Sequence, residues 1–243
     1  MIIKRRLFSR RRNLTPEEER ERELRDRVFR NEYPKLGISH VMSKTFEFRP
    51  GIDKDGKPVD GMASYNKFDS PRGLMSKENE IEAIKSQGGK NQREAKKHIQ
   101  ALKRGKSGII SFNPKAPLHM IPHEGGHPAA ILNAKNKEEK DIADFDGNLV
   151  GAHRDLSLED SFRAHRELLK GGKKLIDREK LANSEGRKML ERQGATKEEL
   201  EKYDRGREGE LDSYYNGIYD LVKKSEKIVN DKLNERDNSK NIK

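Results

Sequence analysis

The sequence predicts a mainly helical α+β protein, and three observations lead to this fold class. Of its 243 residues, 39% are charged and only 31% are hydrophobic, which favours solvated helices around one modest core. Helix-starting patterns occur at Thr15 and again at Thr196. One short, β-branched run, residues 108–112, predicts a strand because glycine and proline bound it. We therefore expect several helices and one small sheet.

The first helix is predicted from its N-terminal cap. Thr15 is a capping residue, Pro16 suits the first helical position, and Glu18 completes a capping box. A highly charged helix should follow and end near Asn31. Further along, residues 76–102 predict a helix that is interrupted at Gly88-Gly89.

The C-terminal half is predicted to contain three more helices. Residues 158–169 and 177–193 should form two helices on either side of a break at Gly171-Gly172. The segment Thr196 to Glu199 repeats the capping box and opens the last long helix. The spacing of its apolar residues predicts one buried face, made of Leu211, Tyr215, Ile218 and Val222.

Shorter signals indicate further strands and turns before residue 76. Residues 45–48 are β-like, and Asp55-Gly56 and Asp60-Gly61 are typical of turns. These signals divide the chain into three parts: a basic arm and charged helix (1–37), a main domain (38–233) and a disordered tail (234–243).

Composition limits the function classes. There are no cysteines, so disulfides and thiolate metal sites are excluded, and any metal must be held by His, Asp or Glu. Lys and Arg number 53 against 42 Asp and Glu, a net charge of +11 that favours acidic partners such as nucleic acid. No apolar stretch approaches a membrane span, and the basic residues 1–12 precede no apolar signal segment. We therefore expect no signal peptide and a cytoplasmic or particle-associated protein.

The segment His123-Glu124-Gly125-Gly126-His127 carries the chemistry. Histidines four residues apart on a helix lie on one face, so both imidazoles can bind one Zn²⁺ ion. Glu124 would lie beside the metal, where it can accept a proton from water that the metal has acidified. Pro128 should kink the helix at His127 and start a new helix, while Pro122 precedes the motif.

At these residues the chain resembles the zincin metallopeptidases, whose active helix carries His-Glu-x-x-His. The resemblance implies a mainly helical zincin-like domain with a small sheet next to the active helix, hydrolysis of a protein or peptide substrate, and Glu124 as the catalytic base. It also implies a strand beside the active helix that pairs with the substrate backbone, and residues 108–112 are placed to be that strand.

The gluzincin branch of that superfamily takes its third zinc ligand from a Glu on a later helix, often with an Asp four residues on that supports a zinc-binding His. Glu208 and Asp212 form the one Glu-x-x-x-Asp pair in the chain, so Glu208 is the expected ligand and Asp212 its supporting residue. The other candidates for third ligand are Glu210, Asp144, Asp146 and His153.

The oxyanion of a tetrahedral intermediate needs a hydrogen-bond donor near the metal. Tyr215, Tyr214 and His153 are the candidates, and each has a simpler role as a core aromatic or a solvent-facing side chain.

Two other functions fit the same sequence. In the first, the chain is a catalytically degenerate zincin-like protein that binds nucleic acid or a phage-type particle through its basic N-terminal arm. Alternatively, the chain would be a toxin-like effector whose metallopeptidase domain acts in another cell.

Overall fold

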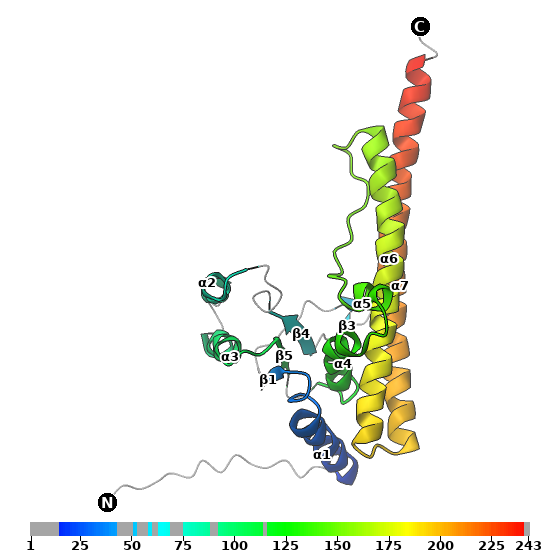
Figure 1. The fold of residues 1–243 in the computed structure, drawn as a ribbon. Helices are drawn as coiled ribbons and strands as arrows, with labels where there is room; N and C mark the ends of the chain where they lie inside the picture. Colours follow the sequence, from blue (N-terminus) through cyan, green and yellow to red (C-terminus); the bar gives the residue numbers. More distant parts are fainter. Residues whose placement is uncertain are drawn as a thin grey trace, which may run out of the picture.

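The computed structural model describes residues 15–42, 51–52, 58–59, 63–68, 75–87, 92–113 and 116–240. Helices predominate and one three-stranded sheet accompanies them, which confirms the predicted α+β class (Figure 1). The helices are α1 (Pro16–Asn31), α2 (Lys77–Gln87), α3 (Gln92–Lys103), α4 (Met120–Asn133), α5 (Lys137–Ala143), α6 (Leu158–Arg192) and α7 (Lys197–Lys240). The strands are β1 (Ile38–Met42), β2 (Gly51–Ile52), β3 (Pro58–Val59), β4 (Ala63–Lys67) and β5 (Gly108–Phe112).

Strand β5 is the centre of the main sheet, whose order is β1-β5-β4. It runs parallel to β1 and antiparallel to β4, and all five of its residues are buried. The predicted strand therefore exists, but both of its edges are already paired. Strand β5 is therefore not free to pair with another chain, contrary to the expectation for residues 108–112. The edge strand next to α4 is β4.

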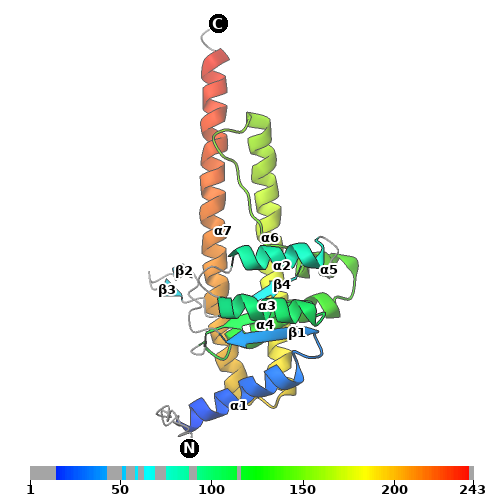
Figure 2. The same ribbon diagram turned by 90° about the vertical axis from the view of Figure 1, so that its left-hand side faces the viewer.

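Helices α6 and α7 form a long hairpin (Figures 1 and 2). The predicted break at Gly171-Gly172 is wrong, because α6 is one helix from Leu158 to Arg192. A Cβ atom on Gly172 would lie 2.7 Å from a side-chain carbon of Ile218, so this glycine allows α7 to approach closely. Helix α7 also continues to Lys240, so residues 234–240 are helical and not a disordered tail.

Helix α1 belongs to the main core. Its Leu24 and Val28 are fully buried and pack in one cluster with Ile110 of β5, Ile121 of α4 and Leu190 of α6. The expected boundary at residue 37 therefore does not separate two packed units.

Both capping boxes are confirmed. Thr15 and Glu18 exchange the two hydrogen bonds of the box at the start of α1, and Thr196 and Glu199 do the same at the start of α7. The remaining sequence signals lie outside the described residues: 1–12, 45–48, Asp55-Gly56, Asp60-Gly61 and Gly88-Gly89.

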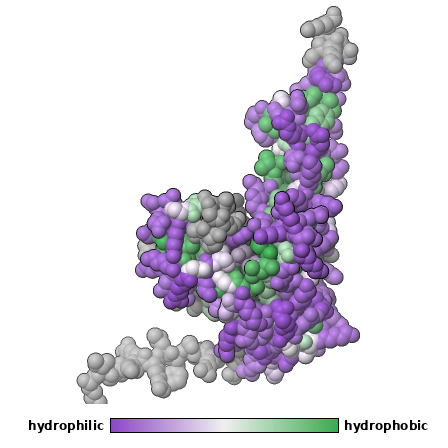
Figure 3. Space-filling model, viewed as in Figure 1, coloured by the Kyte–Doolittle hydropathy of each residue, from purple (hydrophilic) through white to green (hydrophobic). Residues whose placement is uncertain are grey.

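The predicted buried face of α7 is correct only in part. Tyr215 is 46% exposed, whereas Leu211, Ile218 and Val222 are half-buried. Among the described side chains of α7, the fully buried ones are Tyr203, Arg207, Ser225 and Val229. Helix α7 meets the rest of the protein mainly through α6, so its contacts follow the hairpin and not its strongest apolar spacing. The face in Figure 3 is largely hydrophilic, with small apolar patches. Among the described residues, no helix has the length and apolar character needed to cross a membrane.

Candidate metal centre

The histidine motif lies on one continuous helix. Helix α4 runs from Met120 to Asn133 with Pro128 inside it, so no new helix starts at Pro128 as the sequence had predicted. Pro122 is in the first turn, where a backbone N–H has no partner within the helix. Extensive burial of α4 offsets the hydrogen bond that Pro128 removes, since ten of its residues are buried.

The glycines of the motif allow another helix to cross α4 closely. A Cβ atom on Gly126 would lie 2.0 Å from the backbone oxygen of Ala182 in α6. On the other side of the crossing, a Cβ atom on Gly186 would lie 2.7 Å from the backbone oxygen of Pro122. Only glycine fits at both places, and this close packing brings the middle of α6 to the two histidines.

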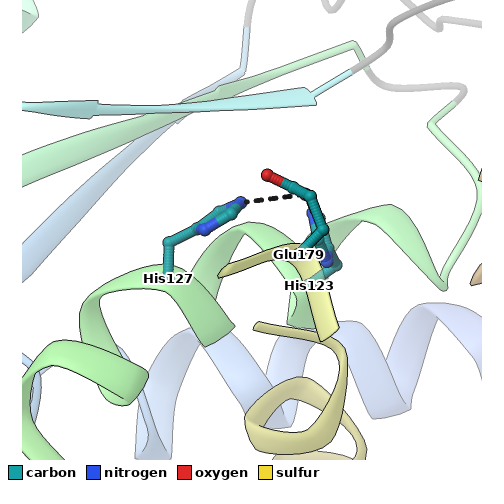
Figure 4. A group of neighbouring side chains, drawn as sticks. All are labelled: His123, His127 and Glu179. Atoms are coloured by element: carbon teal, nitrogen blue, oxygen red, sulfur yellow. Dashed lines mark ion pairs between the residues drawn. The ribbon is translucent and has the colours of Figure 1, made fainter. Parts of the chain in front are cut away.

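Three buried side chains converge at this crossing: His123 and His127 from α4, and Glu179 from α6 (Figure 4). Oε2 of Glu179 is 3.2 Å from Nε2 of His123 and 3.7 Å from Nε2 of His127. Each of the three side chains offers one ligand atom, and these three atoms lie within 4.8 Å of one another.

The hydrogen-bond partners of the group leave its ligand atoms facing one another as acceptors. Burial lowers the pKa of both imidazoles well below the usual value, so both are neutral at neutral pH. Nδ1 of His123 is 2.7 Å from Oδ1 of Asn183, which can only accept, so the proton of this imidazole is on Nδ1. The lone pair on Nε2 then faces a carboxylate oxygen that is buried without a hydrogen-bond donor. A cation between these acceptors would relieve their repulsion.

The distances fit a small divalent ion. In a tetrahedral site with bonds of about 2.0 Å, neighbouring ligand atoms are roughly 3.3 Å apart. The 3.2 Å and 3.7 Å separations lie close to that value. Two imidazole nitrogens and one carboxylate oxygen suit Zn²⁺ and other transition metals, so the donor set indicates a metal without selecting zinc. The second oxygen of Glu179 is 3.4 Å from the guanidinium of Arg178.

Glu124 lies beside the group and not within it. Its Oε2 accepts a hydrogen bond of 2.7 Å from the backbone N–H of Tyr65 in the edge strand β4. Burial, together with the nearby carboxylate of Glu179, raises the pKa of Glu124 to about 7. A carboxyl group with this pKa can take up and release a proton near neutral pH.

The structure does not bring Glu208 and Asp212 to the histidines, since both are exposed on α7. The carboxylate in the group is Glu179, and Asn183, four residues later, supports His123. Glu179 does not fit the Glu-x-x-x-Asp pattern because position 183 is Asn and not Asp. A usable signal was present, because Glu179 follows Ile176 by three residues and precedes Ala182 by three, on an apolar helix face.

The other candidate ligands lie elsewhere. Asp144 pairs with Lys67, and Asp146 is exposed. His153 is exposed beside Asp155. Glu210 binds His119 and Arg207 near the site but is not in the group of three.

Of the candidate oxyanion donors, Tyr214 is the one whose phenol interacts electrostatically with Glu179 and Glu124. Partial burial, with the charges of Glu179 and Glu124, raises the pKa of its phenol, which therefore stays protonated and able to donate. Tyr215 is 46% exposed and lies near the ammonium group of Lys180.

Comparison with known proteins yields no match: no family model, curated protein or solved structure shows significant similarity to this chain.

Proposed function

We propose that this protein is a zinc-dependent metallopeptidase in which His123, His127 and Glu179 hold the metal. The observation that carries the proposal is the convergence of two neutral imidazole nitrogens on a buried carboxylate oxygen that has no donor. Three protein ligands with a further position open to water or substrate are typical of catalytic zinc sites.

Zinc in such a site acidifies water and polarises a carbonyl group. Glu124 supplies the base: its carboxylate lies beside the ligands, and the N–H of Tyr65 orients it. It would accept a proton from the attacking water and pass it to the leaving amine. Tyr214 would donate its phenolic hydrogen to the oxygen on which negative charge develops.

The substrate backbone would lie along β4. This strand is one edge of the main sheet and reaches Glu124 through Tyr65, whereas β5 is enclosed between two strands. An extended peptide that adds to a sheet edge is held by main-chain hydrogen bonds. We therefore transfer to β4 the substrate-pairing role that the zincin resemblance had suggested for residues 108–112.

Metal content tests the proposal directly. Elemental analysis of the purified protein should find about one zinc per chain, and His123→Ala should lose it. Peptidase activity on a disordered protein substrate should then disappear with a chelator and return with added zinc. If the wild type holds no metal after zinc is offered, the proposal fails. A complex with nucleic acid that weakens with salt but ignores chelator would then favour the degenerate, particle-binding alternative.

A further inference from the structure

A chain of hydrogen bonds ends at Nδ1 of His123, the ring nitrogen opposite the Nε2 that faces Glu179. Nε2 of His119, the residue just before α4, is 3.0 Å from Oε1 of Glu210 on α7. The other oxygen of Glu210 accepts a hydrogen bond from Nη1 of Arg207. Nε of Arg207 donates to Oδ1 of Asn183 on α6 at 2.7 Å, and the same oxygen accepts from Nδ1 of His123.

The shared oxygen of Asn183 is the critical atom. An asparagine amide can rotate by half a turn and exchange its oxygen for its NH₂ group. A rotated amide would donate to Nδ1 of His123, and the imidazole proton would move to Nε2, the atom that faces Glu179. That tautomer cannot bind a metal through Nε2.

Arg207 prevents this rotation because a guanidinium group has only donors. After rotation, the NH₂ group of Asn183 would donate to His123 but would also face the N–H of Arg207, so this N–H would be buried without an acceptor. Arg207 is 2% exposed, so water cannot replace the lost partner. Glu210 in turn holds the guanidinium in place.

We propose that Arg207 is a positioning residue that locks the amide of Asn183, and through it the tautomer of His123 that leaves Nε2 free for the metal. This inference rests on the proposed metal site but not on peptide hydrolysis. It assigns a role in that site to α7, a helix that contributes none of the three ligand atoms.

The first test compares two arginines on the same helix. Arg207→Met removes the donor and keeps much of the apolar stem, whereas Arg205→Met removes the same charge from an exposed position. Zinc affinity is measured by competition with a chromophoric chelator. Arg207→Met should bind zinc roughly 10- to 100-fold more weakly, as for other residues that orient metal ligands. Arg205→Met should match the wild type.

A double-mutant cycle separates the lock from a general structural effect. An aspartate at position 183 has two equivalent oxygens and cannot present a donor to His123, so it needs no lock. In the Asn183→Asp background, Arg207→Met should therefore weaken zinc binding less than about 3-fold. An equal loss in both backgrounds would show that Arg207 acts through packing or charge and would overturn the proposal.

The tautomer itself can be measured without any substitution. Nitrogen-15 chemical shifts of histidine-labelled, zinc-free wild type should show His123 protonated at Nδ1, and a proton on Nε2 would refute the lock even if Arg207→Met fails to fold. The two hypotheses fail differently. If the wild type does not bind zinc, the proposed function fails, whereas normal zinc binding by Arg207→Met removes only the role of Arg207.

Discussion

Oε2 of Glu179 on α6 lies 3.2 Å from Nε2 of His123 on α4, and the two residues are 56 positions apart in the sequence. This contact decides which carboxylate joins the two histidines in the candidate metal group. It exists because α4 and α6 cross at Gly126 and Ala182 with no room for a side chain between them.

The first prediction distinguishes the two candidate glutamates. Glu179→Ala removes one of the three proposed ligand atoms and should abolish tight zinc binding, because only the two imidazoles remain. Glu208→Ala removes an exposed carboxylate and should leave the zinc content unchanged. Elemental analysis after dialysis measures both. Loss of zinc in the Glu208 variant, with zinc retained in the Glu179 variant, would reverse the assignment.

The second prediction separates the base from the ligands. Glu124→Gln keeps an oxygen that can accept from the N–H of Tyr65 but removes the group that takes up a proton. Zinc content should stay near one per chain, while peptidase turnover should fall by roughly 10²- to 10⁴-fold. A variant with full activity would disprove the role of Glu124, and a variant without zinc would show that its carboxylate helps to hold the metal.

The third prediction concerns the helix crossing. Gly126→Ala places a Cβ atom against the backbone of Ala182, where no flexible side chain can move away. We expect a loss of about 1–3 kcal/mol in the free energy of unfolding, or more, together with weaker zinc binding. The control is Gly209→Ala on α7, where a Cβ atom would meet nothing within 4 Å. Alanine there should be neutral or stabilise by up to about 1 kcal/mol, because it favours the helix.

Denaturant titrations of the zinc-free Gly126→Ala and Gly209→Ala variants measure their free energies of unfolding, and competition with a chelator measures their zinc affinities. Equal stability of the Gly126 and Gly209 variants would contradict the close crossing of α4 and α6.

The fourth prediction is a pH dependence outside the site. Glu32 is buried; burial raises its pKa, but hydrogen bonds from Arg192 and Gln193 outweigh this effect and hold the pKa below the usual value. A lowered folded pKa contributes stability above the unfolded pKa of about 4.3, and this stability is lost as pH falls through the lower folded value.

Glu32→Gln should therefore lower the free energy of unfolding by about 1–3 kcal/mol near pH 7. The difference in this free energy between the variant and the wild type should shrink as the pH falls toward 3. Urea titrations of zinc-free protein at several pH values measure it, with the exposed Glu208→Gln as control. A difference that stays constant over this range would show that the charge of Glu32 is not its source.

Local sequence signals predicted the elements that local interactions control. The capping boxes at Thr15 and Thr196 were confirmed because each uses only residues within one turn. The glycine and proline rules failed at Gly171-Gly172 and at Pro128. There, packing against neighbouring elements outweighs the local preference for a break.

The sequence by itself determined the pair His123 and His127 with Glu124 beside it, because a four-residue spacing on one helix sets their relation without reference to any other part of the chain. Only the tertiary structure decided that Glu179 joins them, that Asn183 and Arg207 are hydrogen-bonded beside His123, and that β4 is the edge strand next to α4. These residues come from different elements, and which faces meet depends on how closely the backbones can approach. That approach is set by the crossing of α4 and α6, where Gly126 meets Ala182.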